Sequence, residues 1–232
     1  MKTCAVMQPY LFPYLGYYQL VQASDVFVFY DDVNYIKGGY INRNNILSNG
    51  QVQRFTVPIN QASSFKKINE LSFSHNVRKQ LASIEQSYGK APYFHDVYPL
   101  VKAVLNSENR NVTHICRKSV EAVFSYLGIE KETYLSSQLE YNREQSAAER
   151  LISISELLDC RNYINSPGGK ILYCKEFFSE RNIKLSFIEM EDVEYFQSGP
   201  TKEFVPYLSI IDIMMHCDKS LTKKLLNKFS LV

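Results

Sequence analysis

Two adjacent carboxylates, Asp31 and Asp32, are the residues of this chain best suited to acid–base chemistry. They follow residues 26–30, a β-branched and aromatic run that is typical of a buried strand. Functional side chains of α/β sheets gather where the strands end. Paired carboxylates there can bind a substrate amine, hold Mg²⁺ or act as a general base, and we expect Asp31 and Asp32 to be catalytic. The alternative is that both residues only cap a turn, as aspartates often do.

Tyrosines dominate a stiff segment near the amino terminus. Residues 8–20 read QPYLFPYLGYYQL and follow the apolar run 4–7, a pattern that predicts a strand, a turn and the start of a helix. Tyrosine combines a rigid apolar ring with a hydroxyl group, which suits binding of a sugar or another ring. The residues expected to bind substrate here are Gln8, Tyr10, Tyr14 and Tyr17. The alternative is a turn packed with aromatic side chains for stability alone.

Cations and amides follow in a segment rich in glycine and asparagine, residues 35–47, which we expect to be a structured loop. Arginine binds phosphate or carboxylate with two hydrogen bonds, and asparagine amides suit sugar hydroxyl groups or a base. The residues expected to bind substrate here are Lys37, Asn42, Arg43 and Asn44. A solvated loop without a ligand is the alternative.

A second candidate loop, Ser-Pro-Gly-Gly-Lys at residues 166–170, follows a predicted strand. Gly168 and Gly169 would let the backbone approach an anion, and Lys170 would add a charge, so we expect all three to bind substrate. The spacing is not that of a phosphate-binding Walker A loop. A tight turn with an exposed lysine is the alternative.

Composition limits the classes of function. The net charge of +2 does not favour DNA as a partner, and the five scattered cysteines and four separated histidines show no metal-ligand spacing, so we expect no metal site. Buried, reduced thiols and the lack of a signal peptide favour a cytoplasmic location. No apolar run reaches the roughly 18 residues of a membrane span.

Strands and helices alternate along the chain, which predicts an α/β fold with a Rossmann-like, mostly parallel sheet flanked by helices. No linker or repeat is evident, so residues 1–232 are expected to form one α/β domain with a helical portion at about 75–127. Strands are expected at 3–8, 26–30, 53–59, 133–135, 162–165 and 184–188. Helices are expected at 16–23, 75–90, 94–106, 112–127, capped by Gly128, 145–158 and 175–181.

The turn also resembles that of nucleotidyltransferases related to class I aminoacyl-tRNA synthetases. In those enzymes a strand and a turn containing Phe and Pro lead into His-x-Gly-His at the start of a helix. Residues 12–17, Phe-Pro-Tyr-Leu-Gly-Tyr, share this layout, with Tyr14 and Tyr17 in place of the histidines. Those histidines normally stabilise charge on the phosphates, so their replacement argues against adenylation in the usual manner.

Several longer motifs resemble the WbqC-like protein family. The resemblance starts in residues 8–20, continues through Phe-Val-Phe-Tyr-Asp-Asp-Val-Asn-Tyr at 27–35 and Ile-Asn-Arg-Asn at 41–44, and recurs at 88–94, 163–170 and 207–212. It covers nearly the whole chain. Family members often have a bulky aromatic residue such as Trp where this chain has Tyr40, and a tyrosine ring can stack equally well.

The resemblance implies a role in bacterial surface polysaccharides, because such proteins occur among genes for O-antigen of lipopolysaccharide. It implies transfer of glycine or another amino acid to an amino sugar that is attached to a nucleotide. Asp31 or Asp32 would then accept the proton of the sugar amine, and the tyrosines would stack on the sugar or base.

The sequence alone is compatible with three functions. The first is an aminoacyltransferase that uses an activated donor such as aminoacyl-tRNA. The second is an ATP- and Mg²⁺-dependent ligase or nucleotidyltransferase. The third is a protein that binds a sugar nucleotide or another small molecule without catalysis.

Overall fold

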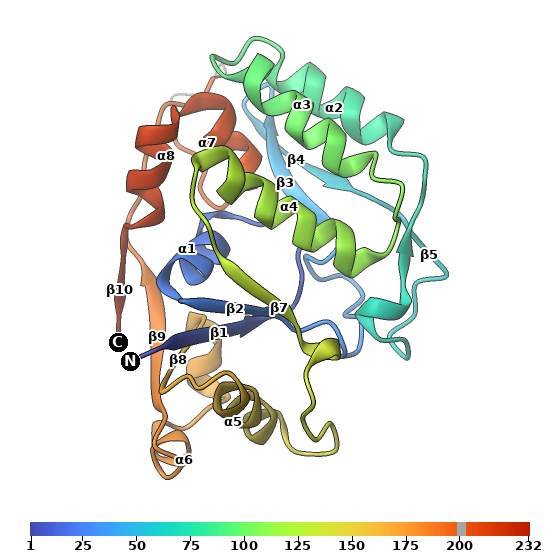
Figure 1. Ribbon diagram of the computed structural model, residues 1–232. Coiled ribbons are helices and arrows are strands. Elements are labelled where there is room, and N and C mark those ends of the chain that lie inside the picture. The colour runs from blue at the N-terminus through green and yellow to red at the C-terminus, as the bar shows by residue number, and fades with distance from the viewer. Residues whose placement is uncertain (199–202) are drawn as a thin grey trace.

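A six-stranded, mostly parallel sheet forms the centre of the computed structural model, which describes residues 1–198 and 203–232 (Figure 1). The strand order is β10-β9-β8-β1-β2-β7, and only β10 runs antiparallel to its neighbour. The strands are β1 (Thr3–Met7), β2 (Val26–Phe29), β7 (Glu132–Leu135), β8 (Asn162–Asn165), β9 (Lys184–Met190) and β10 (Phe229–Leu231). The chain builds outward from β1 to β2 and β7 and then returns to the other side of β1, so the strand order reverses between β1 and β8.

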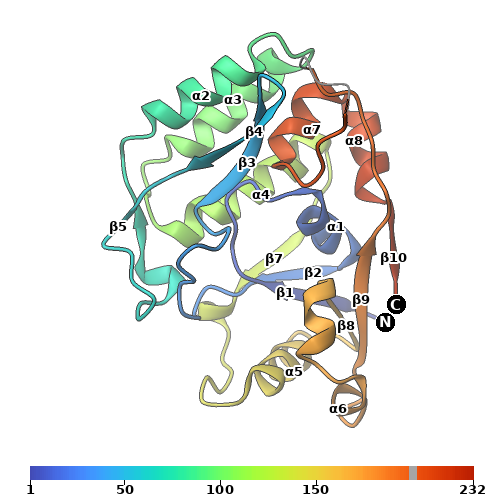
Figure 2. The same cartoon turned by 180° about the vertical axis from the view of Figure 1, so that it is seen from behind.

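Alternate residues along the strands face two separate apolar cores. Ala5 and Phe27 pack with α1 (Leu15–Ala23) and α4 (Val112–Leu127), whereas the second core lies on the opposite face. There Cys4 and Val26 pack with α5 (Ala147–Leu157) and α6 (Lys175–Ser179). Figure 2 shows the same arrangement from behind, with α5 and α6 below the sheet and the other helices above it. Successive residues of each strand point to opposite faces of the sheet, and helices cover both faces, as in other three-layer α/β folds.

The remaining elements extend the upper layer. Two small antiparallel sheets are formed by β3 (Arg43–Ser48) with β4 (Gln51–Thr56) and by β5 (Ile59–Asn60) with β6 (Ser72–Phe73). The helices α2 (Arg78–Tyr88) and α3 (Phe94–Leu105) follow, and α7 (Ile210–His216) and α8 (Lys219–Leu226) come near the carboxyl terminus. Short 3₁₀ turns occur at Ile68–Glu70, Ser136–Gln138 and Pro167–Ile171.

The predicted α/β class with a mostly parallel sheet is confirmed. Gly128 ends α4 in the left-handed conformation, at φ +68°, as its predicted capping role requires. Two expectations were wrong in detail. The expected loop 35–47 already becomes a strand at Arg43, and the strand expected at 53–59 lies in the small β3–β4 sheet rather than in the central one.

Candidate functional site

The tyrosine-rich turn after β1 is built around one strained residue. Phe12 is fully buried and has φ +41°. Residues other than glycine adopt this backbone conformation at a cost of about 1–2 kcal/mol. Three polar contacts hold it: Ser119 Oγ accepts from its N–H at 3.1 Å, while Asn44 Nδ2 and Ser209 Oγ each donate to its carbonyl oxygen at 2.7 Å. Strain fixed from three distant elements is typical of functional turns.

A groove of about 410 Å³ opens beside this turn, and we name it the tyrosine groove. Its walls include Tyr10, Pro13, Tyr14, Tyr40, Pro206 and Tyr207. The ring of Tyr14 meets the ring of Tyr207 edge to face, with centroids 6.2 Å apart. Tyr207 is largely exposed and has φ +59°, so a second strained residue lies at this site.

A smaller cavity of about 190 Å³ lies where the strand order reverses, and we name it the switch-point cavity. Met7 at the end of β1 and Ser166 just after β8 line it together with Tyr10, Tyr14 and Tyr17. Ligands of parallel α/β sheets bind at this position. Tyr10 and Tyr14 line both this cavity and the tyrosine groove, so the two spaces share a wall.

The tyrosines differ in how their phenols are used. The Tyr17 hydroxyl donates to the carbonyl oxygen of Gln8 at 2.9 Å, so both residues help to fix the turn. Burial raises the pKa of Tyr10 and Tyr14, and raises that of Tyr17 further. All three phenols are therefore neutral hydrogen-bonding groups at physiological pH.

Close packing explains the glycine that begins α1. A Cβ atom on Gly16 would lie 2.5 Å from the ring of Tyr14. The glycine therefore lets the Tyr14 ring lie flat against the start of the helix. The side chain of the N-cap residue, Tyr14, makes no capping hydrogen bond, and the first turn of the helix carries no acidic residue.

Both predicted catalytic carboxylates are buried where β2 ends, and groups after β7 surround them. Asp32 accepts hydrogen bonds from Tyr141 Oη at 2.8 Å, from Arg143 Nε at 2.7 Å and from Ser136 Oγ. With Tyr141 donating to both carboxylate oxygens, this carboxylate is engaged by protein donors on both sides. Its contacts thus tie β2 to the chain that follows β7.

Asp31 is more deeply buried than Asp32, at 1% against 7% exposed, but it accepts fewer hydrogen bonds from the described residues. Its Oδ1 accepts from the Ser137 N–H at 2.9 Å and from Ser136 Oγ at 3.1 Å, and its Oδ2 accepts from Ser137 Oγ at 2.9 Å. A carboxylate has about four acceptor positions, so Oδ2 retains capacity for a further donor. Asp31 also lines a cavity of about 510 Å³ that shares no lining residue with the tyrosine groove.

The residues predicted in the 35–47 segment do not form one cluster. Asn42 is buried, accepts from Tyr35 Oη and donates to the Val57 carbonyl, and Asn44 holds Phe12. Arg43 is half-buried, and Lys37 is exposed on the surface. Of the four, only Asn44 lines the tyrosine groove.

The Gly-Gly-Lys loop lies after β8, beside the switch-point cavity. Gly169 packs so closely on Asn165 that a Cβ would lie 2.9 Å from its side chain, whereas Gly168 is exposed with open space around it. Lys170 forms an ion pair with Glu189 on the neighbouring strand. Ser166 and Pro167, which precede the glycines, are the residues that line the cavity.

Residues 191–198 and 203–209 form a segment that closes the tyrosine groove, and we name it the strap. No role was predicted for this segment from the sequence. A buried network fastens it to α7: Asp212 accepts from Tyr88 Oη at 2.8 Å, Tyr195 Oη at 2.6 Å and Gln197 Nε2 at 3.0 Å. Ser198 N–H donates to His216 Nε2 at 3.1 Å. The only sequence signal was the motif at 207–212.

The described residues bear on both metal binding and membrane crossing. Within residues 1–198 and 203–232, no three His, Cys, Asp or Glu side chains are grouped so that they could hold a metal ion. No helix in the same ranges combines the length and apolarity needed to cross a membrane.

Comparisons with known proteins agree with the motifs. No solved structure matches the chain. It is 26% identical to the uncharacterized protein Rv1507c of Mycobacterium tuberculosis over 223 residues, which cover 93% of this chain and 94% of that protein. The model of the WbqC-like protein family matches residues 8–224, which include the turn, both carboxylates and the strap. The chain therefore belongs to the WbqC-like protein family.

Proposed function

We propose that this protein transfers an aminoacyl group, glycine in the simplest case, to the amine of a nucleotide-linked amino sugar during synthesis of a bacterial surface polysaccharide. The observation that carries the proposal is the tyrosine groove, which lies beside the position where parallel α/β sheets bind ligands. Tyr14 and Tyr207 present aromatic faces and edges there, and such surfaces stack on sugars and bases.

Amide formation needs a base for the attacking amine. The amine nitrogen bonds to the activated acyl carbon, the bond from that carbon to its leaving group breaks, and a base takes the amine proton. We assign the base to Asp31, because its Oδ2 retains acceptor capacity and its side chain lines a cavity. On this proposal the sugar amine enters that cavity while the nucleotide lies in the tyrosine groove. Asp32 then acts as a positioning residue through Ser136, which donates to both carboxylates.

A non-catalytic role is the second candidate, and the surroundings of the carboxylates favour it. Each carboxylate already accepts several hydrogen bonds from the protein, as structural carboxylates do. On this alternative the chain binds a sugar nucleotide in the tyrosine groove and presents it to another protein. An ATP-dependent reaction is less favoured, because the Tyr17 phenol donates to a backbone carbonyl where nucleotidyltransferases with a similar turn have a histidine.

The test is to look for the amide product by mass spectrometry. The purified protein is incubated with UDP-glucosamine and either glycyl-tRNA or glycine with ATP and Mg²⁺. We expect product with glycyl-tRNA, and about a hundredfold loss of rate or more in Asp31→Asn, as for removal of a general base. Asp25→Asn is the matched control, because Asp25 lies exposed at the opposite end of β2.

Each outcome decides between the candidates. Product that requires ATP supports the ligase alternative. Binding of UDP-glucosamine without product from either donor supports the non-catalytic alternative. Product formed equally well by Asp31→Asn and the native chain contradicts the role of Asp31.

A further inference from the structure

The cavity beside Asp31, which we name the polar cavity, differs in chemistry from the tyrosine groove. It has a volume of about 510 Å³ and lies between α4 and the chain that follows β2 and β7. Only one of its lining residues, Leu135, has an aliphatic side chain. A space of this size and polarity suits a small polar molecule rather than an aromatic ring.

Two positive charges, those of Arg117 and Lys118, lie on the α4 side of this cavity beside the imidazole of His114. His114, Arg117 and Lys118 lie within about one helical turn of each other and all line it. Arg117 uses Nε to bind Glu121 at 2.7 Å, and the described residues offer no hydrogen-bond partner to its two terminal nitrogens. The Lys118 ammonium has one long contact, 3.5 Å to Ser107 Oγ. These groups match the two charges and several oxygens of a phosphoryl group.

Negative charges line the same cavity. Glu121 uses Oε1 for Arg117 and Thr133, and none of the described residues donates to its Oε2. Asp31 has acceptor capacity left on Oδ2. Two carboxylates with unused acceptor positions match a protonated amine or the N–H groups of a neutral one.

We propose that the polar cavity binds a small molecule that carries both an amine and a phosphoryl group. The phosphoryl group lies toward Arg117 and Lys118, and the amine lies toward Asp31 and Glu121. The amides of Asn69 and Gln138, which also line the cavity, are available for hydroxyl groups. The ligand is a phosphorylated amino sugar or an aminoacyl phosphate, which share this chemistry. The inference rests on the proposed function only in the choice of these two ligands, which would be the acceptor and the activated donor of the transfer.

Isothermal titration with glucosamine 1-phosphate tests the site in the full chain. Glucosamine and glucose 1-phosphate each lack one of the two groups, and 2-aminoethyl phosphate keeps both without the sugar ring. We expect glucosamine 1-phosphate to bind about tenfold more tightly than glucosamine or glucose 1-phosphate, because a charged hydrogen bond is lost with each. Equal binding of 2-aminoethyl phosphate would favour the aminoacyl phosphate over the sugar.

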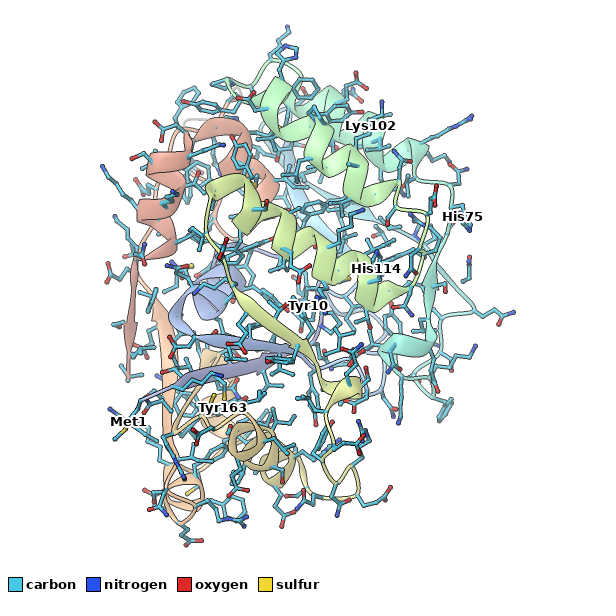
Figure 3. All side chains as sticks on the ribbon, in the orientation of Figure 1. Met1, Tyr10, His75, Lys102, His114 and Tyr163 are labelled. Carbon is cyan, nitrogen blue, oxygen red and sulfur yellow. The ribbon has the colours of Figure 1, made fainter. Side chains whose placement is uncertain are left out.

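Variants locate the ligand. Lys118→Gln is expected to weaken glucosamine 1-phosphate binding about tenfold, whereas Lys102→Gln, which removes the same charge from α3, leaves it unchanged. Figure 3 shows Lys102 on α3 and His114 on the cavity-lining helix α4. Equal weakening in both variants, or none in either, would overturn the proposal. Loss of binding in Tyr14→Leu but not in Lys118→Gln would place the ligand in the tyrosine groove. That result overturns this inference and the assignment of Asp31 as the base, because Asp31 does not line the groove, but it leaves the groove as the sugar-nucleotide site.

Discussion

The carbonyl oxygen of Phe12 shows how single residues support the tyrosine groove. Asn44→Ala removes one of its two side-chain donors and also the Asn44 Oδ1 that accepts from the Asn45 N–H at 2.8 Å. Since these groups are buried, we expect unfolding to be easier by about 2 kcal/mol, or a thermal midpoint lower by about 4–8 °C. Thermal unfolding followed by circular dichroism measures this shift.

Asn45→Ala is the matched control for that substitution. Its side-chain oxygen accepts a single bond, at 3.3 Å, from Arg54 on the surface of the hairpin. We expect a shift of no more than about 0.5 kcal/mol, as for an ordinary surface change. A similar shift in both variants would show that the Phe12 carbonyl does not depend on Asn44.

Asp32→Asn should act on stability more than a surface change does. An amide oxygen placed at Oδ2 can still accept from Tyr141 and Arg143, but the amide NH₂ then replaces the Oδ1 that accepts from Ser136 Oγ. The substitution also removes the charge that pairs with Arg143. Arg143 is about one-third exposed, which reduces the cost, and we expect a loss of about 2 kcal/mol. Urea unfolding measures it, and an unchanged midpoint would contradict the structural role given to Asp32.

The residue types of the 35–47 segment indicated that it carries polar side chains. They did not indicate which atoms those side chains bind. Asn42 and Asn44 were expected to bind substrate, and the structure shows their amides bonded to backbone carbonyls. Their roles in binding remain predictions. The sequence alone could not show these contacts, because the Phe12 carbonyl lies 32 residues from Asn44 along the chain and is brought there by folding.

The strap is the element whose attachment controls one wall of the groove. Tyr195→Phe removes one of three donors to the buried Asp212 carboxylate while keeping the ring that packs against Phe204. We expect a local cost of about 1–3 kcal/mol, seen as faster amide hydrogen exchange in residues 193–198. The hydrogen bonds between the strap and Asp212 would then break more often than those in the rest of the fold.

Tyr134→Phe removes an exposed hydroxyl that donates to Glu132 and is the control for that experiment. Exchange in the strap should be the same in this variant as in the native chain. If exchange rises equally in both variants, or in neither, the Asp212 network does not hold the strap.

Elements with a clear pattern were predicted well. The first strand, turn and helix, the strand before the carboxylates and the helices α2, α3 and α4 all appear within a few residues of the expected bounds. The helix α7 was missed, because every residue from Ile210 to His216 is buried and no polar face reveals a helical period. The three-residue strand β10 is too short to give a signal of its own.

Buried tyrosines should make the whole molecule sensitive to alkali. Burial raises the pKa of Tyr17, Tyr18, Tyr88 and Tyr163 well above the usual value, whereas phenols of the unfolded chain ionise near pH 10. Above about pH 10 the unfolded chain therefore releases protons that the folded chain retains, so stability is lost as the pH rises. Below that pH the stability from these groups is fully present.

The absence of tryptophan from the sequence makes this measurable by tyrosine absorbance. We expect part of the 17 tyrosines to ionise only in the cooperative step in which circular dichroism reports unfolding. Ionisation of all tyrosines in one smooth curve, with the fold retained, would contradict the burial of these rings.

The fold class followed from strand–helix alternation, since each parallel strand needs a crossover helix. The separation of the tyrosine groove from the polar cavity could not be predicted. Asp31 and Tyr10 both follow adjacent strands of one sheet, so sequence reasoning brought them into one site. The structure instead directs the chain after β1 toward the hairpin and strap, and places Asp31 beside α4.

Titration of UDP-glucosamine into the native chain and into Tyr14→Leu tests the central claim most directly. Leucine keeps the bulk of an apolar side chain but removes the ring that faces Tyr207. We expect saturable binding by the native chain, weakened about tenfold by the substitution, as for loss of one stacking contact. No binding, or equal binding by both proteins, would contradict the claim that the tyrosine groove binds a nucleotide-linked amino sugar.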